Sequence, residues 1–368
     1  MTINALFCFV FIGGIINFSP DFGRFKHIYY RMKKMIVFLV FLSLLLLSAC
    51  SSDALNSNNL VSTTNGFAGI NVTGISNESI SDITAIVKDV RQGKIELSEN
   101  EMEKVKFLIN KYGLFDLVEV AFPDEELECL TLKSGMTVQK KDDFYIIGDI
   151  LFTEEQIKEF YTKTESDNYS DDIQLRGSIS TVSSHKWPGG TVYYEFDANM
   201  TQATKIMALE AMSHWASVTN INYMYKTSSN KDYIRFFNGV GCYSYIGRQG
   251  GKQDLSLDAS WAVTGNAIHE FGHAIGLHHE HCKLNRDQDI IVSTNNIQQA
   301  SLSNYTRVTS NSFFSFNFDY GSIMLYSSFN STAINQNLPV MTTLSGSTWT
   351  AQRNSASAAD IAVVNFIY

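Results

Sequence analysis

The stretch HEFGHAIGLHHEH, residues 269–281, holds five of the eight histidines of this 368-residue chain. On an α-helix, residues four positions apart lie on one face, so His269 and His273 direct two imidazoles toward a common point. Glu270 lies about 100° further round the helix, beside that point and within reach of a bound water. This spacing predicts a helix that carries a metal site.

The residues that follow supply a third ligand. Gly276 allows the left-handed turn that ends a helix, and beyond it His279 can return toward the metal. Three neutral histidines leave a fourth position open, which is typical of catalytic zinc. His278 and His281 lie at the wrong phase, and we interpret them as surface residues or as residues that support the ligands from outside.

An open zinc position predicts hydrolysis. Zinc lowers the pKa of a bound water from 15.7 to about 7, and Glu270 can accept the proton as the water attacks a carbonyl polarised by the metal. The same carboxyl group can then pass the proton to the leaving amine. The sequence therefore predicts cleavage of an amide bond.

The N-terminus reads as an export signal. In residues 32–49, lysines precede an apolar run and small residues, a pattern typical of a signal peptide. Cys50 follows as in a bacterial lipobox, which predicts a lipid anchor on the membrane; an ordinary secretion signal is the alternative. Residues 1–31 are interpreted as a misassigned extension, with Met32 as the initiator. We expect an exported cell-envelope or surface protein whose last part can be released to the medium.

Charge and composition divide the rest of the chain. Residues 50–176 carry a net charge of −12, whereas residues 177–368 carry −1. The first segment begins as a polar tether, and it ends in a polar loop that offers a site for cleavage near Arg176. No basic patch indicates nucleic acid binding. The segment after Cys50 and the last half are therefore expected to be separate units.

Hydrophobic periodicity locates the main elements. We expect a helical pattern between residues 81 and 111, a helix over 201–217, strands over 233–237 and 255–257, and the metal-binding helix over 264–276.

The last half resembles the astacin family of metzincin zinc metalloendopeptidases. Its HExxHxxGxxH pattern is shared by metzincins, and Glu280, directly after the third histidine, is similar to the residue that astacins carry. Further similar stretches are GCYSYIGRQGG from Gly241, QDLSLD from Gln253 and DYGSIMLY from Asp319. The resemblance implies a zincin-type α+β fold with a twisted, mostly antiparallel sheet, a backing helix, a zinc helix and an irregular C-terminal lobe. A smaller pro-region would precede this fold.

The resemblance also implies residue roles. One Zn²⁺ would be bound by His269, His273 and His279. Glu270 would act as the general base, Met324 would form the Met-turn beneath the metal, and Tyr326 would stabilise the oxyanion. QDLSLD would be the edge strand that pairs with an extended protein or peptide substrate.

The resemblance implies that residues 50–176 contain an inhibitory propeptide. Astacin propeptides block zinc with an aspartate in a Phe-x-Gly-Asp stretch, and here Gly148 and Asp149 match while the phenylalanine does not. Asp149 is the candidate zinc ligand of the latent form, and a simple hairpin turn is the other interpretation. Cys129 is the rival ligand. After cleavage, the new N-terminus would pack beside Glu280.

Departures from the family pattern leave the catalytic atoms in place. Trp261 stands at the usual position of the disulfide partner of Cys242, so Cys242 is expected to be a buried or differently paired thiol. Lys283 replaces an arginine after HEH. A binding module or adhesin that keeps the fold without catalysis is the alternative function, and retention of Glu270 argues against it.

Overall fold

The computed structural model describes residues 79–132, 135–161, 178–314 and 317–368. These residues belong to a compact unit that spans Asn71–Tyr368. We call residues 79–161 the N-terminal region and residues 178–368 the C-terminal region. No helix in the described part of the chain has the length and apolar character needed to cross a membrane. The leader, Cys50 and Arg176 lie outside the described residues.

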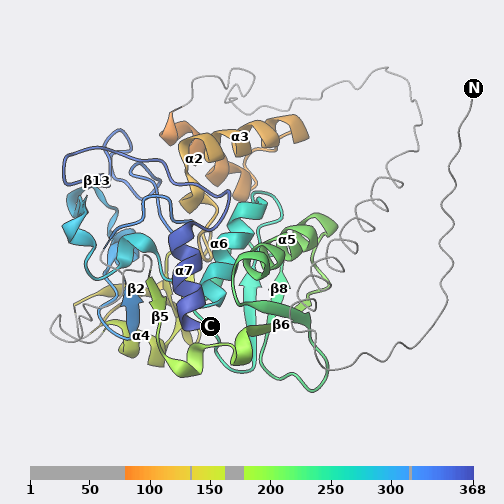
Figure 1. Cartoon of the computed structure of the whole chain (residues 1–368). Helices are drawn as coiled ribbons and strands as arrows, with labels where there is room; N and C mark the ends of the chain where they lie inside the picture. The colour runs from red at the N-terminus through yellow and green to blue at the C-terminus, as the bar shows by residue number, and fades with distance from the viewer. Residues whose placement is uncertain (1–78, 133–134, 162–177, 315–316) are drawn as a thin grey trace, which may run out of the picture. The chain divides into compact units, whose positions relative to one another are not determined.

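A nine-stranded sheet runs through both regions (Figure 1). Its strand order is β1-β2-β3-β4-β9-β10-β8-β6-β7. The N-terminal region supplies β1 (Glu128–Thr131), β2 (Thr137–Lys141), β3 (Phe144–Ile147) and β4 (Ile150–Thr153). The C-terminal region supplies β6 (Thr191–Phe196), β7 (Asn222–Tyr225), β8 (Tyr233–Phe237), β9 (Tyr243–Tyr245) and β10 (Lys252–Ser256). Two small sheets pair β11 (Ile290–Val292) with β13 (Met341–Thr343) and β12 (Ser312–Phe314) with β5 (Ser178–Ser180).

Several of the helices begin or end at recognisable capping residues. The N-terminal region contains α2 (Ile80–Arg91), α3 (Glu99–Tyr112) and α4 (Glu154–Tyr161), and the C-terminal region contains α5 (Gln202–Val218), α6 (Thr264–Ala274) and α7 (Ala358–Ile367). Ser79 caps α2 and Thr201 caps α5 through their side chains, while Gly113 ends α3 in the left-handed conformation. Helices α5 and α6 pack against each other, and the Trp215 indole donates a 2.9 Å hydrogen bond to the Ile268 carbonyl. The backing helix and the metal-binding helix are thus confirmed.

The α+β class is confirmed, and the large sheet is mixed: four neighbouring pairs of its described strands are antiparallel and four are parallel, where we expected mostly antiparallel pairs. Among the described strands of the large sheet, the pairs β1–β2, β2–β3, β3–β4 and β9–β10 are antiparallel. Strand β4 runs parallel to β9, and β10, β8, β6 and β7 run parallel to one another. The sheet is mixed because α5 carries the chain from the end of β6 back to the start of β7, a crossover that makes the two strands parallel.

The prediction that QDLSLD forms an edge strand is also wrong. Its strand, β10, is hydrogen-bonded on one side to β8 and on the other to β9. The chain reverses between β9 and β10 through glycines with positive φ, including Gly247 and Gly250, so β9 lies outside β10. Strand β4 of the N-terminal region covers the free side of β9, with Ile150 opposite Ser244 and Leu151 opposite Tyr245.

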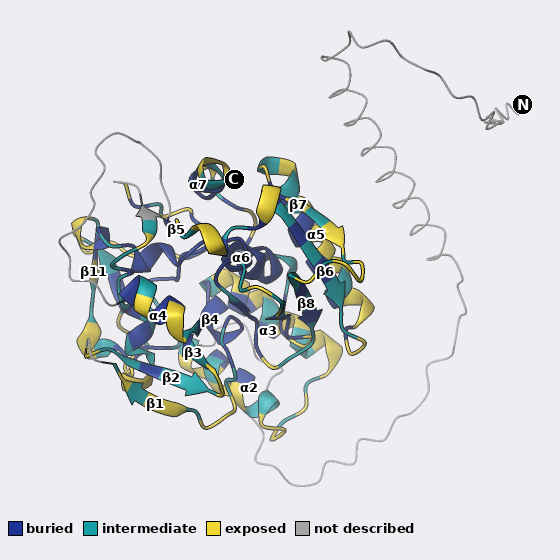
Figure 2. Ribbon diagram, turned by 90° about the horizontal axis from the view of Figure 1, so that it is seen from below, coloured by how far each residue is buried: buried dark blue, intermediate teal, exposed yellow. Residues whose placement is uncertain are grey.

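The two regions share one hydrophobic core. Ile83, Leu114 and Phe115 of the N-terminal region belong to the same buried cluster as Trp215 and Phe271 of the C-terminal region. Figure 2 shows α6 in dark blue near the centre of the unit, and all its residues from Gly265 to Ala274 are buried. The helix that carries the predicted metal site is therefore enclosed on every side.

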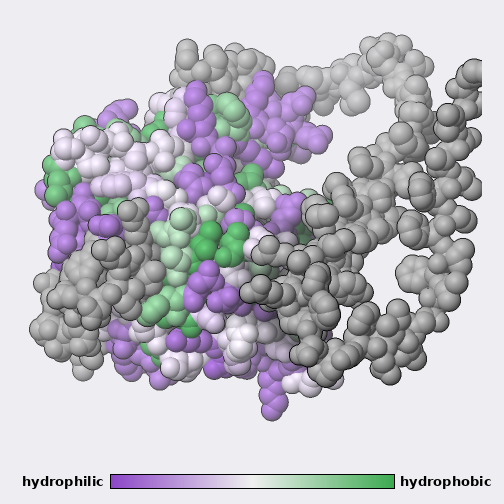
Figure 3. Space-filling view, in the orientation of Figure 1, coloured by the Kyte–Doolittle hydropathy of each residue, from purple (hydrophilic) through white to green (hydrophobic). Residues whose placement is uncertain are grey.

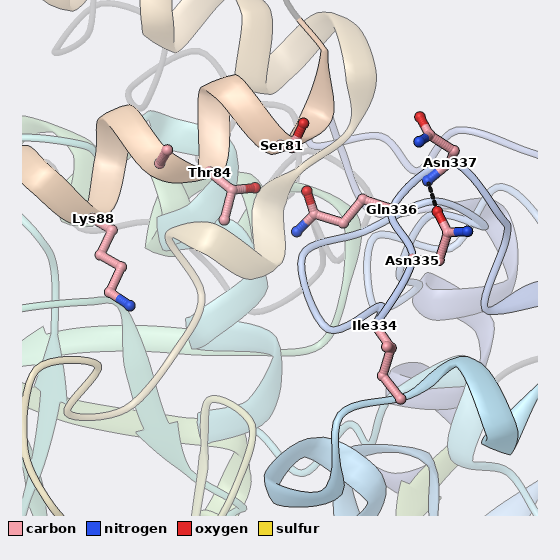
Figure 4. A pocket seen from close by; sticks show the side chains of 8 residues that line it. Ser81, Thr84, Lys88, Ile334, Asn335, Gln336 and Asn337 are labelled. Carbon is pink, nitrogen blue, oxygen red and sulfur yellow. Dashed lines mark hydrogen bonds between the residues drawn. The ribbon is translucent and has the colours of Figure 1, made fainter.

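The outer surface carries less organised features. On the face shown in Figure 3, an apolar patch lies over α7, the helix that carries the half-exposed Phe366. A shallow hollow opens between α2 and the loop of residues 334–337 (Figure 4). Its lining includes Thr84, Lys88 and Gln336 but none of the histidines.

Candidate metal centre and active site

The metal-binding helix presents its two histidines as predicted. His269 and His273 lie on one face of the buried helix α6, and their Nε2 atoms are 3.1 Å apart. The helix ends at Ala274, and Gly276 follows with φ of 106°, which is costly for any residue with a side chain. This turn brings the His279 ring to 4.7 Å from the His273 ring and 5.5 Å from the His269 ring.

Backbone carbonyls fix the orientation of two of the rings. Nδ1 of His269 donates to the Ile323 carbonyl and Nδ1 of His273 donates to the Leu277 carbonyl, each over 2.7 Å. In the neutral imidazoles, the lone pairs are then on Nε2 and point into the common space. Burial lowers the pKa of His273 to about 4, which keeps this ring neutral.

A carboxylate of the N-terminal region completes the cluster. Oδ2 of Asp149 lies 3.0 Å from Nε2 of His269 and 3.8 Å from Nε2 of His273, while Oδ1 lies 3.0 Å from Nε2 of His279. Burial opposes ionisation of Asp149, but its close contacts, first with His279 and then with His269 and His273, hold its pKa well below the ordinary value.

This donor set fits a zinc ion. Metal–ligand bonds of 2.0–2.1 Å in a tetrahedron separate neighbouring ligand atoms by roughly 3.3 Å, close to the separations found here. Without a cation, the bare Nε2 atoms of His269 and His273 would face each other and a carboxylate in a site with no exposed surface. Three nitrogens and one carboxylate oxygen thus lie where they could hold one metal ion.

Gly148 and Asp149 form the two-residue turn between β3 and β4. The two interpretations of Asp149 are therefore compatible, because a residue of this hairpin turn also contacts the histidines. Gly148 has φ of 67°, and Ser244 donates a backbone hydrogen bond to the Asp149 carbonyl. Cys129 lies on the outermost strand β1 as an exposed free thiol, so the fold brings Asp149 to the histidines and leaves Cys129 away from them.

Glu270 lies next to the ligands as a buried carboxyl group without a partner. Neither of its oxygens accepts a hydrogen bond among the described residues. Burial, followed by the negative charges of Asp149 and Glu119, raises its pKa well above the ordinary value. A carboxyl group in this condition is suited to take up a proton.

Met324 and Tyr326 line the centre from the C-terminal lobe. A Cβ atom on Gly272 would lie 2.9 Å from the Met324 sulfur, so this glycine makes room for the thioether against the metal-binding helix. The Tyr326 ring lies 4.8 Å from the His279 ring, and its hydroxyl lies beside Gly148. Burial raises the pKa of Tyr326 well above its ordinary value, so the phenol stays a hydrogen-bond donor.

Glu280 and Lys283 form a buried pair behind the site. The Lys283 ammonium lies 3.1 Å from the Glu280 carboxylate and donates to the Asn317 carbonyl over 2.6 Å. The Asp319 backbone N–H donates to the same carboxylate. Burial raises the pKa of Glu280 to about 7 despite these partners. Lys283, where the resemblance implied an arginine, thus forms an ion pair with Glu280.

The two remaining histidines of the opening stretch are not on the surface, so the first of the two interpretations, that they are surface residues, is wrong. His278 and His281 are both fully buried. His278 packs edge-on against Phe160 of α4, which covers it, while the His281 ring stacks 5.0 Å from the ligand His279. Cys242 and Cys282 are buried free thiols, as one of the two expectations for Cys242 stated.

Sequence reasoning missed a further buried carboxylate, that of Glu119. Glu119 pairs with Arg353 through two 2.6 Å contacts, accepts a 2.8 Å hydrogen bond from Asn266, and lies 3.9 Å from Nε2 of His269. The only local signal is the position of this acid in the apolar run LFDLVEV. Its role depends on a partner 234 residues later in the chain.

Comparisons with known proteins agree with this geometry. The family model described as Astacin, a peptidase family, matches residues 180–368. The zinc metalloproteinase nas-31 of Caenorhabditis elegans is 35% identical over 190 residues, which cover 50% of this chain and 31% of that protein. Blastula protease 10 of Paracentrotus lividus is 32% identical over 232 residues, covering 60% of this chain and 38% of that protein. The chain thus spans about a third of the length of these relatives.

Among solved structures, the hatching enzyme zinc-protease high choriolytic enzyme 1 of Oryzias latipes is 25% identical, with a TM-score of 0.45. The match covers 56% of this chain and 98% of that one. Because the family model covers half of the chain, including the metal-binding helix, and because His269, His273 and His279 converge as a zinc site typical of that family, this chain belongs to the astacin family.

Proposed function

We propose that the chain is a zinc metalloendopeptidase made in a latent form. The observation that carries this proposal is the unpartnered Glu270 carboxyl group beside three histidines whose Nε2 atoms face one point. A binding module would gain nothing from a buried acid without a hydrogen bond, because such a group costs stability. A group held in this condition is better explained by a reaction that uses it.

The residues divide the reaction between them. When bound by the three histidines, zinc supplies a Lewis acid that polarises the substrate carbonyl and acidifies a water. Glu270 accepts the proton of the attacking water and later gives it to the leaving amine. Tyr326 donates its phenolic hydrogen toward the oxygen that becomes negative. Protein or peptide substrates would lie extended along β9, the strand that β4 now covers.

Latency follows from the same contacts. Asp149 occupies the position that a water needs, at 3.0 Å from His269 and His279, and β4 occupies the strand edge that a substrate needs. Cleavage in the loop near Arg176 would free the N-terminal region. The new N-terminus would then approach Glu280, where it would compete with Lys283 for the carboxylate.

Export by residues 32–49, with lipidation of Cys50, is part of the same proposal. An extracytoplasmic site suits an enzyme that cleaves proteins, because latency protects the producing cell during export. A C-terminal region released by cleavage near Arg176 would lose the anchor. Labelling with a palmitate analogue of wild type and Cys50→Ser tests the anchor; equal labelling would contradict it.

The experiment that tests the activity uses the full chain with zinc, before and after limited proteolysis of the loop. We expect the cleaved wild type to hydrolyse casein and the cleaved Glu270→Gln variant to bind zinc equally but to lose at least about 1,000-fold in rate. Asp149→Asn should give the uncleaved chain measurable activity, and Cys129→Ala serves as its control. Cleaved wild type that holds one zinc ion and cuts no peptide would leave the binding module as the function.

A further inference from the structure

The Glu119–Arg353 pair is buried to an unusual degree. Both side chains have no exposed surface. The guanidinium binds the carboxylate in a bidentate manner through Nε and Nη2, the geometry that gives the strongest arginine–carboxylate contact. The third guanidinium nitrogen donates to the neutral carbonyls of Leu325 and Gln352.

The C-terminal region provides the pocket that receives this carboxylate. The Asn266 side-chain oxygen accepts a hydrogen bond from the Val263 backbone N–H at the start of α6, which directs its amide nitrogen toward Glu119. The N-terminal end of a helix favours a negative charge. Among the described residues, Glu119 is the one carboxylate within ion-pair distance of Arg353. The pocket is therefore cationic, and the N-terminal region supplies its counter-charge.

Neighbouring contacts hold the same segment in place. The Phe115 ring lies 4.7 Å from the Arg353 guanidinium carbon. Asp116 accepts a 2.8 Å hydrogen bond from the Ser331 backbone N–H and a second hydrogen bond from the Ser331 hydroxyl. The Val118 carbonyl accepts from the Cys242 backbone N–H. Residues 113–119 thus enter the C-terminal region through a set of contacts distinct from those of the turn at Asp149.

We propose that residues 113–119 form a second inhibitory anchor, in which Glu119 holds the N-terminal region on Arg353 independently of the metal. The inference rests on the latent peptidase proposed above and adds a regulatory contact to it. Asp149 blocks the metal, and its hold depends on the ion. Glu119 binds an arginine that stays charged whether or not zinc is present. Loss of metal, or loss of the Asp149 contact, leaves the region docked.

Hydrogen exchange of the full chain tests this anchor, with zinc and after chelation. The variants are Glu119→Gln, Asp149→Asn and the matched control Glu125→Gln, which removes a half-exposed acid of the same region. Removing one partner of a buried pair leaves the other charge uncompensated, so Glu119→Gln should speed exchange over residues 113–121 by about 100-fold or more in both states. Glu125→Gln should leave it unchanged, and Glu119→Asp should fall between.

Two outcomes would overturn the proposal. One is exchange over residues 113–121 that Glu119→Gln leaves at the wild-type rate. The other is an equal increase in α5 and α6, which would make Glu119 a general core residue. As a second measurement, the uncleaved Glu119→Gln/Asp149→Asn double variant should hydrolyse peptide faster than Asp149→Asn alone. If no cleaved form hydrolyses peptide, the peptidase proposal fails, whereas the exchange rates still decide the anchor.

Discussion

Replacing Gly265 by alanine sets helix propensity against packing. Gly265 is the second residue of α6, and alanine is favoured over glycine by about 1 kcal/mol inside a helix. However, a Cβ atom there would lie 1.8 Å from the backbone oxygen and 2.5 Å from the Cβ of Arg353. Non-bonded carbon atoms need about 3.5 Å, so the Arg353 backbone would have to withdraw by roughly 1.5 Å.

Packing should prevail by a clear margin. A backbone carbonyl cannot rotate away as a side-chain end can, and overpacking of this kind costs about 1–3 kcal/mol or more. Withdrawal of Arg353 also weakens its buried pair with Glu119, and full loss of such a pair costs about 3–5 kcal/mol. After the propensity gain is subtracted, Gly265→Ala should destabilise the chain by about 2 kcal/mol or more, which lowers Tm by roughly 4–8 °C.

Differential scanning calorimetry of the full chain measures the effect. Gly93→Ala is the control, because Gly93 has φ of 65° but nothing within 4 Å of an added Cβ atom, so it reports backbone strain alone at about 1–2 kcal/mol. A Gly265→Ala chain as stable as wild type, or more stable, would refute the claim that α6 and the Arg353 segment are in direct backbone contact.

Three further predictions follow from the site and its support. Chelation should lower the Tm of the wild type, and added zinc should restore it. The His273→Asn variant should have a lower Tm in the presence of zinc, and its Tm should change less on chelation. Equal changes of Tm for the two chains in calorimetry would contradict the ligand set. Burial raises the pKa of Asp116 to about 6. The folded chain therefore binds this proton more tightly than the unfolded chain, and the contribution of Asp116 to the free energy of unfolding falls as pH rises from 4 to 6. In urea unfolding, the loss of stability between pH 4 and pH 6 should be smaller for Asp116→Asn than for wild type by about 3 kcal/mol. Trp215→Phe should cost about 1–3 kcal/mol in urea unfolding, because the Ile268 carbonyl loses its buried donor; an unchanged midpoint would contradict this.

The metal centre was predictable because most of its geometry is local. Two ligands and the adjacent acid lie within one turn and a half of α6, and Gly276 fixes the turn that returns His279. Such relations depend on helix period and on a single backbone conformation, both of which a sequence displays. The position of Asp149 was suggested only by family resemblance, since its contacts with the histidines span 120 residues or more.

Strand directions and burial were less accessible for the opposite reason. Whether β10 is an edge depends on which strands lie beside it, and here β9 and β8 pair with its two sides, while the N-terminal strand β4 covers β9. Helical phase predicts the direction of the His278 side chain but not which residue covers it. Phe160 of α4, from another part of the chain, covers it. Periodicity describes one element at a time, whereas pairing and cover join elements that are distant in sequence.

The net charge of a segment could not predict the role of Glu119. The excess of −12 over residues 50–176 describes a long-range field, which water and salt screen within about 8–10 Å. The contacts between the two regions instead depend on two individual acids, Glu119 and Asp149, that are removed from water and meet a guanidinium and three imidazoles. The receiving region has a net charge of only −1, so its composition gives no hint of a cationic pocket. Electrostatic recognition here is set by which charges are buried together, and that is decided by the fold.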